Sequence, residues 1–150
     1  MTDTFRLTSV LKLRRRERDQ AGKDVAEANA AISLLDAKLQ EIDEQDRSMD
    51  ELRRKSSDGP IDLGQLLDAQ RFQMVLAAQR THIERDRSLL LQELDRRQRK
   101  LVVCQQSVRS LEKLEEQHVI RLEERSRAKE QSRLDEWSQV QRTVAIRREG

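Results

Sequence analysis

The sequence predicts an all-α protein in which two long helices form an antiparallel coiled-coil hairpin, with the second helix overhanging the first. The 150 residues are 39% charged and 2% aromatic, and the 30 basic and 28 acidic residues are interleaved along the chain. This composition is typical of long exposed helices. Apolar residues recur at alternating spacings of three and four, which is the period of a coiled-coil seam. The single proline and two of the four glycines lie in one short central stretch, where the chain can turn.

The first helix is predicted over about residues 4–55. Its seam repeats with 3-4 spacing, and nine of its twelve positions are apolar. These positions are Leu11, Arg14, Arg18, Ala21, Val25, Ala28, Ile32, Leu35, Leu39, Ile42, Asp46 and Met49. An arginine near the end of a seam can lay its methylenes on the apolar surface with its guanidinium in water.

A loop is predicted over residues 56–62, because Asp58-Gly59-Pro60 combines a turn dipeptide with a residue that cannot continue a helix. Pro60 and Asp62 then suit the start of a second helix, over about residues 63–147, as first-turn proline and N-cap. Its seam comprises Leu66, Ala69, Leu76, Ile83, Leu90, Leu94, Leu101, Cys104, Val108, Leu111, His118 and Leu122. Polar residues interrupt this seam at Gln73, Arg80, Arg87, Arg97 and Glu115.

A short loop between long helices makes them antiparallel neighbours, and the chain is expected to be one hairpin domain over residues 1–150. Folding back at residue 59 places Ile42 opposite Leu76, Val25 opposite Glu93–Leu94, and Phe5 opposite Lys113. The second helix then outruns the first by about thirty residues. This overhang carries a stripe without an internal partner, which suggests contact with another protein or a second copy. The stripe comprises Leu134, Trp137, Val140 and Val144.

The composition also excludes several functions. A net charge of +2, without a basic run interleaved with aromatics, does not indicate a nucleic-acid-binding surface. No apolar run approaches the about 20 residues of a membrane span. The lone cysteine excludes an internal disulfide, and the N-terminal residues lack the order of a signal peptide, so a cytoplasmic protein is expected. No phosphate-binding loop, HExxH or CxxC motif is present, so no enzyme activity, cofactor, metal or small-molecule substrate is expected.

Several residues have an ordinary structural explanation. His82 is predicted to be a solvated helix residue, His118 a polar seam residue, and Cys104 a packed core residue. Two segments leave alternatives open. Phe72 and the row Leu67, Met74 and Ala78 lie off the narrow seam, so they form either a wide core near the loop or a partner surface. Apolar residues at the N-terminus precede the basic cluster Arg14–Arg16, which is either a solvated helix end or a contact for anionic lipid or an acidic ring.

Two terminal motifs resemble those of a known family. The pattern Phe-x-Leu-x-x-Val-Leu-x-Leu-Arg over Phe5–Arg14 resembles the opening of the FliJ family, small coiled-coil proteins of the flagellar type III export apparatus. Near the other end, Lys129 followed by Leu134-Asp135-Glu136 is similar to the family's C-terminal signature. The length, the central break and the Phe72–Leu76 step agree, although the tyrosines common around the family's central segment are missing.

The resemblance implies a stalk similar to the central shaft of rotary ATPases. Such a stalk inserts into the hexameric ring of the flagellar export ATPase and promotes its activity. It also contacts the membrane-embedded export gate and cycles export chaperones. The implied location is the cytoplasm, with peripheral association at the inner face of the cytoplasmic membrane. The stalk of a virulence injectisome and a generic coiled-coil scaffold remain alternatives, and the chain alone is expected to be monomeric.

Carried over by motif, the implied ring contacts are Phe5, Leu7, Val10, Leu11, Arg14, Leu134, Asp135 and Glu136. Trp137 lies beside the C-terminal signature and shares a helix face with Leu134, so it is added to the predicted ring contacts. Phe72 and Leu76 match the surface that meets the export gate.

Overall fold

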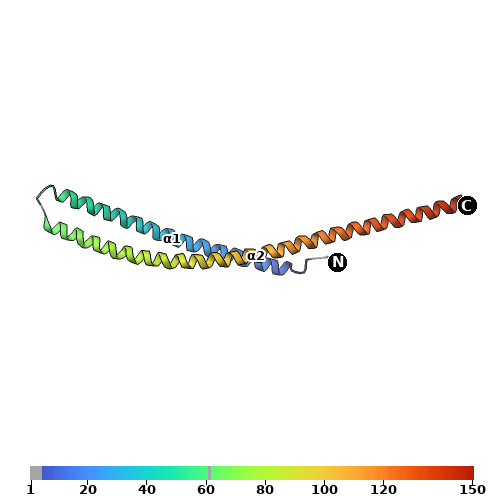
Figure 1. The fold of residues 1–150 in the computed structure, drawn as a ribbon, viewed down its shortest axis with the longest axis horizontal. Helices are drawn as coiled ribbons and strands as arrows, with labels where there is room; N and C mark the ends of the chain where they lie inside the picture. Colours follow the sequence, from blue (N-terminus) through green and yellow to red (C-terminus); the bar gives the residue numbers. More distant parts are fainter. Residues whose placement is uncertain (1–4, 61) are drawn as a thin grey trace. The chain divides into compact units, whose positions relative to one another are not determined.

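In a computed structural model that describes residues 5–60 and 62–150, the chain forms two helices, α1 (Thr8–Ser56) and α2 (Leu63–Glu149), shown in Figure 1. The described residues contain no strand, and the two helices pack against each other. The predicted all-α helical hairpin is therefore confirmed. Contacts divide the chain into two compact units, and α1 and α2 each contribute to both. One unit is residues 17–104, and the other combines the described residues up to Arg16 with residues 105–150.

Local hydrogen bonds define where each helix begins. The Thr8 hydroxyl donates to the Phe5 carbonyl at 2.6 Å, and the Thr8 N–H donates to the same oxygen at 3.1 Å. The predicted start at residue 4 lies outside the described residues, and residues 5–7 precede the helix. At the start of α2, the Asp62 carboxylate accepts from the N–H groups of Gly64 at 3.0 Å and Gln65 at 3.4 Å. Asp62 is therefore the N-cap that the sequence predicted, whereas Pro60 precedes the N-cap and does not lie in the first turn as predicted.

The core follows the predicted seams. The buried apolar residues are Leu11, Ala21, Ala28, Ile32, Ile42, Leu76 and Val108, and each is a predicted seam position. Of the twelve seam positions of α1, only Arg14 is exposed. Every predicted seam position of α2 is at least half-buried, the five polar interruptions included. Heptad spacing therefore identified the buried face of both helices, because a two-helix hairpin buries only one narrow stripe on each.

Within residues 17–104, polar side chains on the α2 seam reach acidic side chains on α1. Arg80 pairs with Asp43, and Arg87 Nε donates to Asp36 at 2.6 Å. Asp43 was expected near residue 75, so its pairing with Arg80 lies more than one helical turn further along α2. The predicted antiparallel direction is correct, and the predicted register is wrong.

The second unit, formed by the described residues up to Arg16 and residues 105–150, is held together by fewer contacts. Arg15 donates to Glu112 at 3.1 Å, and the rings of Phe5 and His118 lie 5.7 Å apart, tilted by 45°. Phe5 was expected opposite Lys113, so the register differs here in the same direction. Beyond Leu122 every residue of α2 is exposed, and residues 123–149 are called the tail below. The tail is helical throughout.

Candidate partner-binding surfaces

The titratable residues that the sequence singled out do not converge on a reaction centre. Among residues 5–60 and 62–150, no group of three His, Cys, Asp or Glu side chains could hold a metal ion. His82 pairs with Asp86 at 3.4 Å in an exposed position, and Cys104 is half-buried on the seam. His118 lies against the Phe5 ring. Each of these environments matches the ordinary structural role predicted for its residue.

One carboxyl on α2 has a shifted pKa. A hydrogen bond from Arg96, with a second from Arg97, holds the pKa of Glu93 below its usual value. The nitrogen to oxygen distances are 2.8 Å and 2.9 Å. Hydrogen bonds to an ionised carboxylate favour its charged form, which explains the direction of the shift. Arg97 also donates to the Asp24 carbonyl of α1 at 2.7 Å, so this cluster links the two helices.

The predicted ring contacts at the start of α1 are divided between buried and exposed positions. Leu11 is only 2% exposed, while Phe5 and Leu7 are half-buried. Val10 and Arg14 are exposed. Leu11 packs in the core and presents almost no surface to a partner, so its predicted direct contact does not fit this fold. The other four residues remain predicted contacts.

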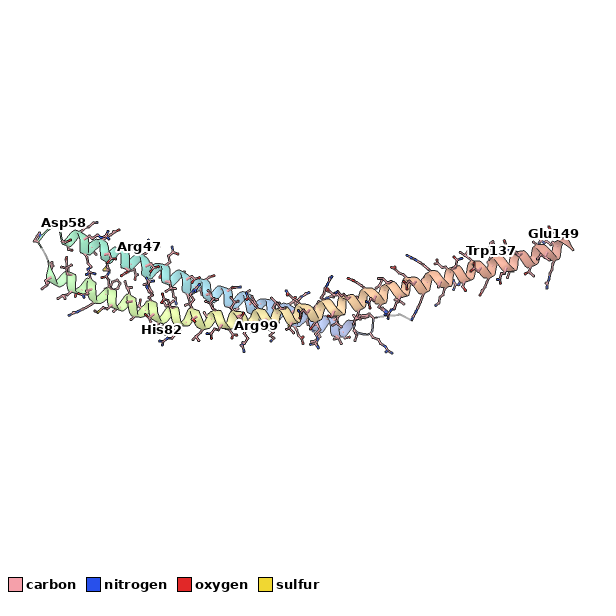
Figure 2. The ribbon with its side chains drawn as sticks, viewed as in Figure 1. Arg47, Asp58, His82, Arg99, Trp137 and Glu149 are labelled. Atoms are coloured by element: carbon pink, nitrogen blue, oxygen red, sulfur yellow. The ribbon has the colours of Figure 1, made fainter. Side chains whose placement is uncertain are left out.

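The predicted contacts at the other end lie on the tail. Leu134 is 59% exposed and Trp137 is 61% exposed, and Figure 2 shows Trp137 on the unpaired helix. Asp135 and Glu136 are exposed as well, and Asp135 accepts a hydrogen bond from Gln131 at 3.3 Å. Val140 and Val144 continue the exposed stripe, lining an open groove with Gln141, Ala145, Arg148 and Glu149. Among the described residues of its unit, the stripe therefore has no partner.

The two groups of predicted ring contacts are separate. The N-terminal group meets α2 at His118, which precedes Trp137 by nineteen residues. At a rise of 1.5 Å per residue, this is about 28 Å along α2. A ring that contacts both groups would therefore need surfaces separated by a similar distance along α2.

A third surface lies beside the loop, within residues 17–104. Met49 and Leu52 of α1 form a groove of ≈ 450 Å³ with α2, referred to below as the loop-proximal groove. On α2 it is lined by Gln65, Asp68, Ala69 and Phe72. Phe72 is 39% exposed and can meet a partner, whereas Leu76 is 2% exposed and lies in the core. The predicted gate contact at Leu76 therefore does not fit this fold, and that at Phe72 remains a prediction.

The structure also exposes apolar residues that the sequence left undecided or did not single out. Leu67 and Met74 were assigned either to a wide core or to a partner surface, and they are 46% and 65% exposed. Their exposure favours a partner surface, because the narrow core near the loop excludes them. Val119 and Ile120 line a second groove among four glutamates and Arg15. Their positions off the seam, beside Glu115, Glu116 and Glu123, could have indicated this exposure.

Along the part of the chain that the structure describes, neither helix is long and apolar enough to cross a membrane.

The fold and these surfaces define a helical hairpin that presents exposed apolar side chains at both ends of α2. The chain belongs to the Flagellar FliJ protein family, whose model matches residues 3–145. Membership indicates a protein of the flagellar export apparatus. No curated protein and no solved structure matches the chain.

Proposed function

We propose that this chain is the stalk of a flagellar export ATPase, inserting into the hexameric ring and promoting its activity. The observation that carries the proposal is the tail, a helix without a partner among the described residues, whose exposed stripe includes Leu134 and Trp137. On a FliJ-family hairpin, such an end is suited to entering a ring. The other roles proposed for the stalk are contact with the export gate and exchange of export chaperones, at the cytoplasmic face of the membrane.

The surface chemistry supports a shaft that bears on its ring through many weak contacts. The tail displays both signs of charge, with acidic residues such as Asp135 beside basic ones such as Arg133. Exposed ion pairs contribute about 0–1 kcal/mol each, so they can exchange as ring subunits change conformation. A few exposed apolar side chains then supply most of the binding free energy. No residue of the stalk has to take part in ATP hydrolysis.

The test mixes the purified full chain with the flagellar export ATPase and follows hexamer assembly and ATP turnover. The expected result is that micromolar chain raises both. The double variant Leu134→Ala/Trp137→Ala should lose most of this stimulation. Leu34→Ala, which removes a 66% exposed leucine from residues 17–104, is the matched control and should retain it. If the wild-type chain changes neither hexamer formation nor turnover, the stalk proposal is wrong.

Sedimentation separates the stalk from a generic scaffold. A stalk that enters a ring should sediment as a monomeric rod at micromolar concentration. A tight dimer at that concentration would instead cover the tail stripe with a second copy and support the scaffold.

The proposed gate contact is tested separately, at the loop-proximal groove. Phe72→Ala should weaken binding of the export gate's cytoplasmic part without lowering the helix content. Leu89→Ala removes an exposed side chain of the same helix outside this groove and should bind normally. If the wild type, Phe72→Ala and Leu89→Ala all bound the export gate equally, the gate contact would lie elsewhere on the chain.

A further inference from the structure

Three polar pairs cross between the helices of residues 17–104 at equal steps, and they are called the ladder here. The pairs are Gln73–Asp50, Arg80–Asp43 and Arg87–Asp36. Each step of seven residues along α1 matches a step of seven in the opposite direction along α2. The three α2 members occupy half-buried seam positions, so the ladder repeats with the period of the apolar core.

A ladder with this repeat does not select one register by itself. Moving α1 by one heptad towards the loop, about 10 Å, would bring Asp43 level with Gln73 and Asp36 level with Arg80. Arg87 would then meet Asn29, whose side-chain carbonyl can accept its hydrogen bond. All three α2 members of the ladder would again have an acceptor on α1.

The apolar seam tolerates the same slide. The ladder places Ile32 within one residue of Leu90 and Leu39 within one residue of Ile83. After a slide of one heptad, Ile32 would lie within one residue of Ile83 and Leu39 within one residue of Leu76. All five residues are buried or half-buried seam residues, so apolar side chains would still pack against apolar side chains.

The connection between the helices also allows both registers. In the structure, Ser56 is about level with Leu66, so the first turn of α2 extends past the end of α1. After the slide, Leu63 would be about level with Leu52, and the last turn of α1 would extend past the start of α2. In both registers, the two helix ends joined by the connection from Ser56 to Leu63 would be offset by about one turn. In the structure α2 extends further, and after the slide α1 would extend further.

Contacts at Arg97 and at the start of α1 favour the register seen in the structure. Arg97 donates to the Asp24 carbonyl at 2.7 Å, and the slide would break this bond. Because α1 is one continuous helix, the slide would also separate Arg15 from Glu112 and the Phe5 ring from His118. The slid register is therefore higher in free energy.

From these observations we infer that residues 17–104 exchange between two registers one heptad apart, with the slid register as the minor state. The exchange repeats the polar and apolar pattern without unfolding either helix. It changes how much of α2 is covered by α1. This inference does not depend on which protein the stalk binds.

Crosslinking of the full chain tests the inference. In a Cys104→Ser background, Asp43→Cys is combined with Arg80→Cys for the observed register or with Gln73→Cys for the slid register. The control combines Asp43→Cys with Ala78→Cys, which lies on the exposed face of α2, away from the seam. A short bifunctional maleimide then traps each pair irreversibly, so that a minor state populated at roughly 0.1–10% accumulates with time.

The expected result is fast crosslinking of the 43–80 pair, slower but substantial crosslinking of the 43–73 pair, and little product from the 43–78 control. Equal slow rates for 43–73 and 43–78 would mean local unfolding rather than a slide, and would overturn the inference. If the 43–73 pair does not crosslink, either alone or together with the 43–80 pair, the inference is also overturned.

A further variant should shift the balance in a known direction. Asn29→Asp places a carboxylate opposite Arg87 only in the slid register, so it should raise the rate of the 43–73 crosslink by about two- to fivefold, as expected of one exposed ion pair. Asn29→Ala is the matched control and should not raise it. An unchanged rate in Asn29→Asp would contradict the exchange, provided that circular dichroism shows full helix content.

Discussion

The paired part of α2, residues 63–122, and the tail have the same kind of sequence and different surroundings. In the paired part, every predicted seam residue is at least half-buried against α1. In the tail, apolar residues spaced equally well for a helix face, such as Leu134 and Val144, are 59% and 45% exposed. Helical spacing therefore shows which face of a helix can be buried. The length of α1 decides which part of that face on α2 is buried within the chain.

The largest expected difference between the two parts is in stability. Leu76→Ala should lower the free energy of unfolding by about 2–3 kcal/mol, because it leaves a cavity in a core only one side chain wide. Leu134→Ala in the tail should change it by less than about 0.5 kcal/mol. Urea unfolding followed by circular dichroism measures both. Similar values for the two variants would mean that the tail is packed in solution.

The next difference is in binding, and it rests on the proposed stalk function. Trp137→Ala should leave the free energy of unfolding unchanged and weaken binding to the export ATPase by about 2 kcal/mol, as expected of a buried aromatic in an interface. Trp137→Phe is the control and should recover part of the loss. Titration of the ATPase with labelled chain measures the affinity. Full affinity in Trp137→Ala would remove this residue from the contact.

A smaller difference concerns the cross-helix ion pairs. Arg87→Ala should cost about 0.5–1 kcal/mol of stability, because the Arg87–Asp36 pair is only partly shielded from water. Arg133→Ala in the tail should lower the free energy of unfolding by less. A double-mutant cycle with Asp36→Ala isolates the pair, and the coupling should shrink at high salt. A coupling unaffected by salt would argue against an electrostatic pair.

The smallest expected effect is a dependence on pH at Glu93. Its pKa is lowered in the fold by hydrogen bonds from Arg96 and Arg97, so its stabilising contribution is present above the unfolded pKa. The contribution is lost as the pH falls from about 4.5 through the lower folded pKa. The difference in melting temperature between wild type and Glu93→Gln should therefore vanish in that window. A difference that persisted at lower pH would assign the effect to packing.

The buried face could be read from the sequence, and the register could not. Ile32, Ile42 and Leu76 sit on a heptad seam that packs against another helix, so their burial was predictable. The register depended on the loop, and folding back at residue 59 falls five residues from the observed alignment and two from the alignment one heptad away. The polar ladder recurs in both alignments, so contacts such as that of Arg97 with the Asp24 carbonyl distinguish them.

The candidate surfaces show a similar division between what the sequence predicted and what it did not. Spacing alone put Leu76 on the seam, whereas the family resemblance put it on a partner surface, and its 2% exposure decides for the seam. Leu11 shows the same conflict with the same outcome. Exposure of Trp137 was predictable, because the first helix is too short to reach it. The partner of Trp137 was not, because an exposed stripe shows only that something can cover it.

The hairpin connection has a consequence for how the chain folds. Cross-helix contacts begin with Arg53–Gln73, only 20 residues apart, continue to Arg87–Asp36 at 51, and reach Arg15–Glu112 at 97. Once the first of these closes, each later contact extends an existing pairing by a few residues, so the chain entropy of long loop closure is never lost in one step. We expect folding to zip outwards from the turn, with φ-values that fall from Leu76 towards Leu11. The tail would then emerge from the ribosome after every partner of α1 has been made, and its synthesis could not delay closure of the hairpin.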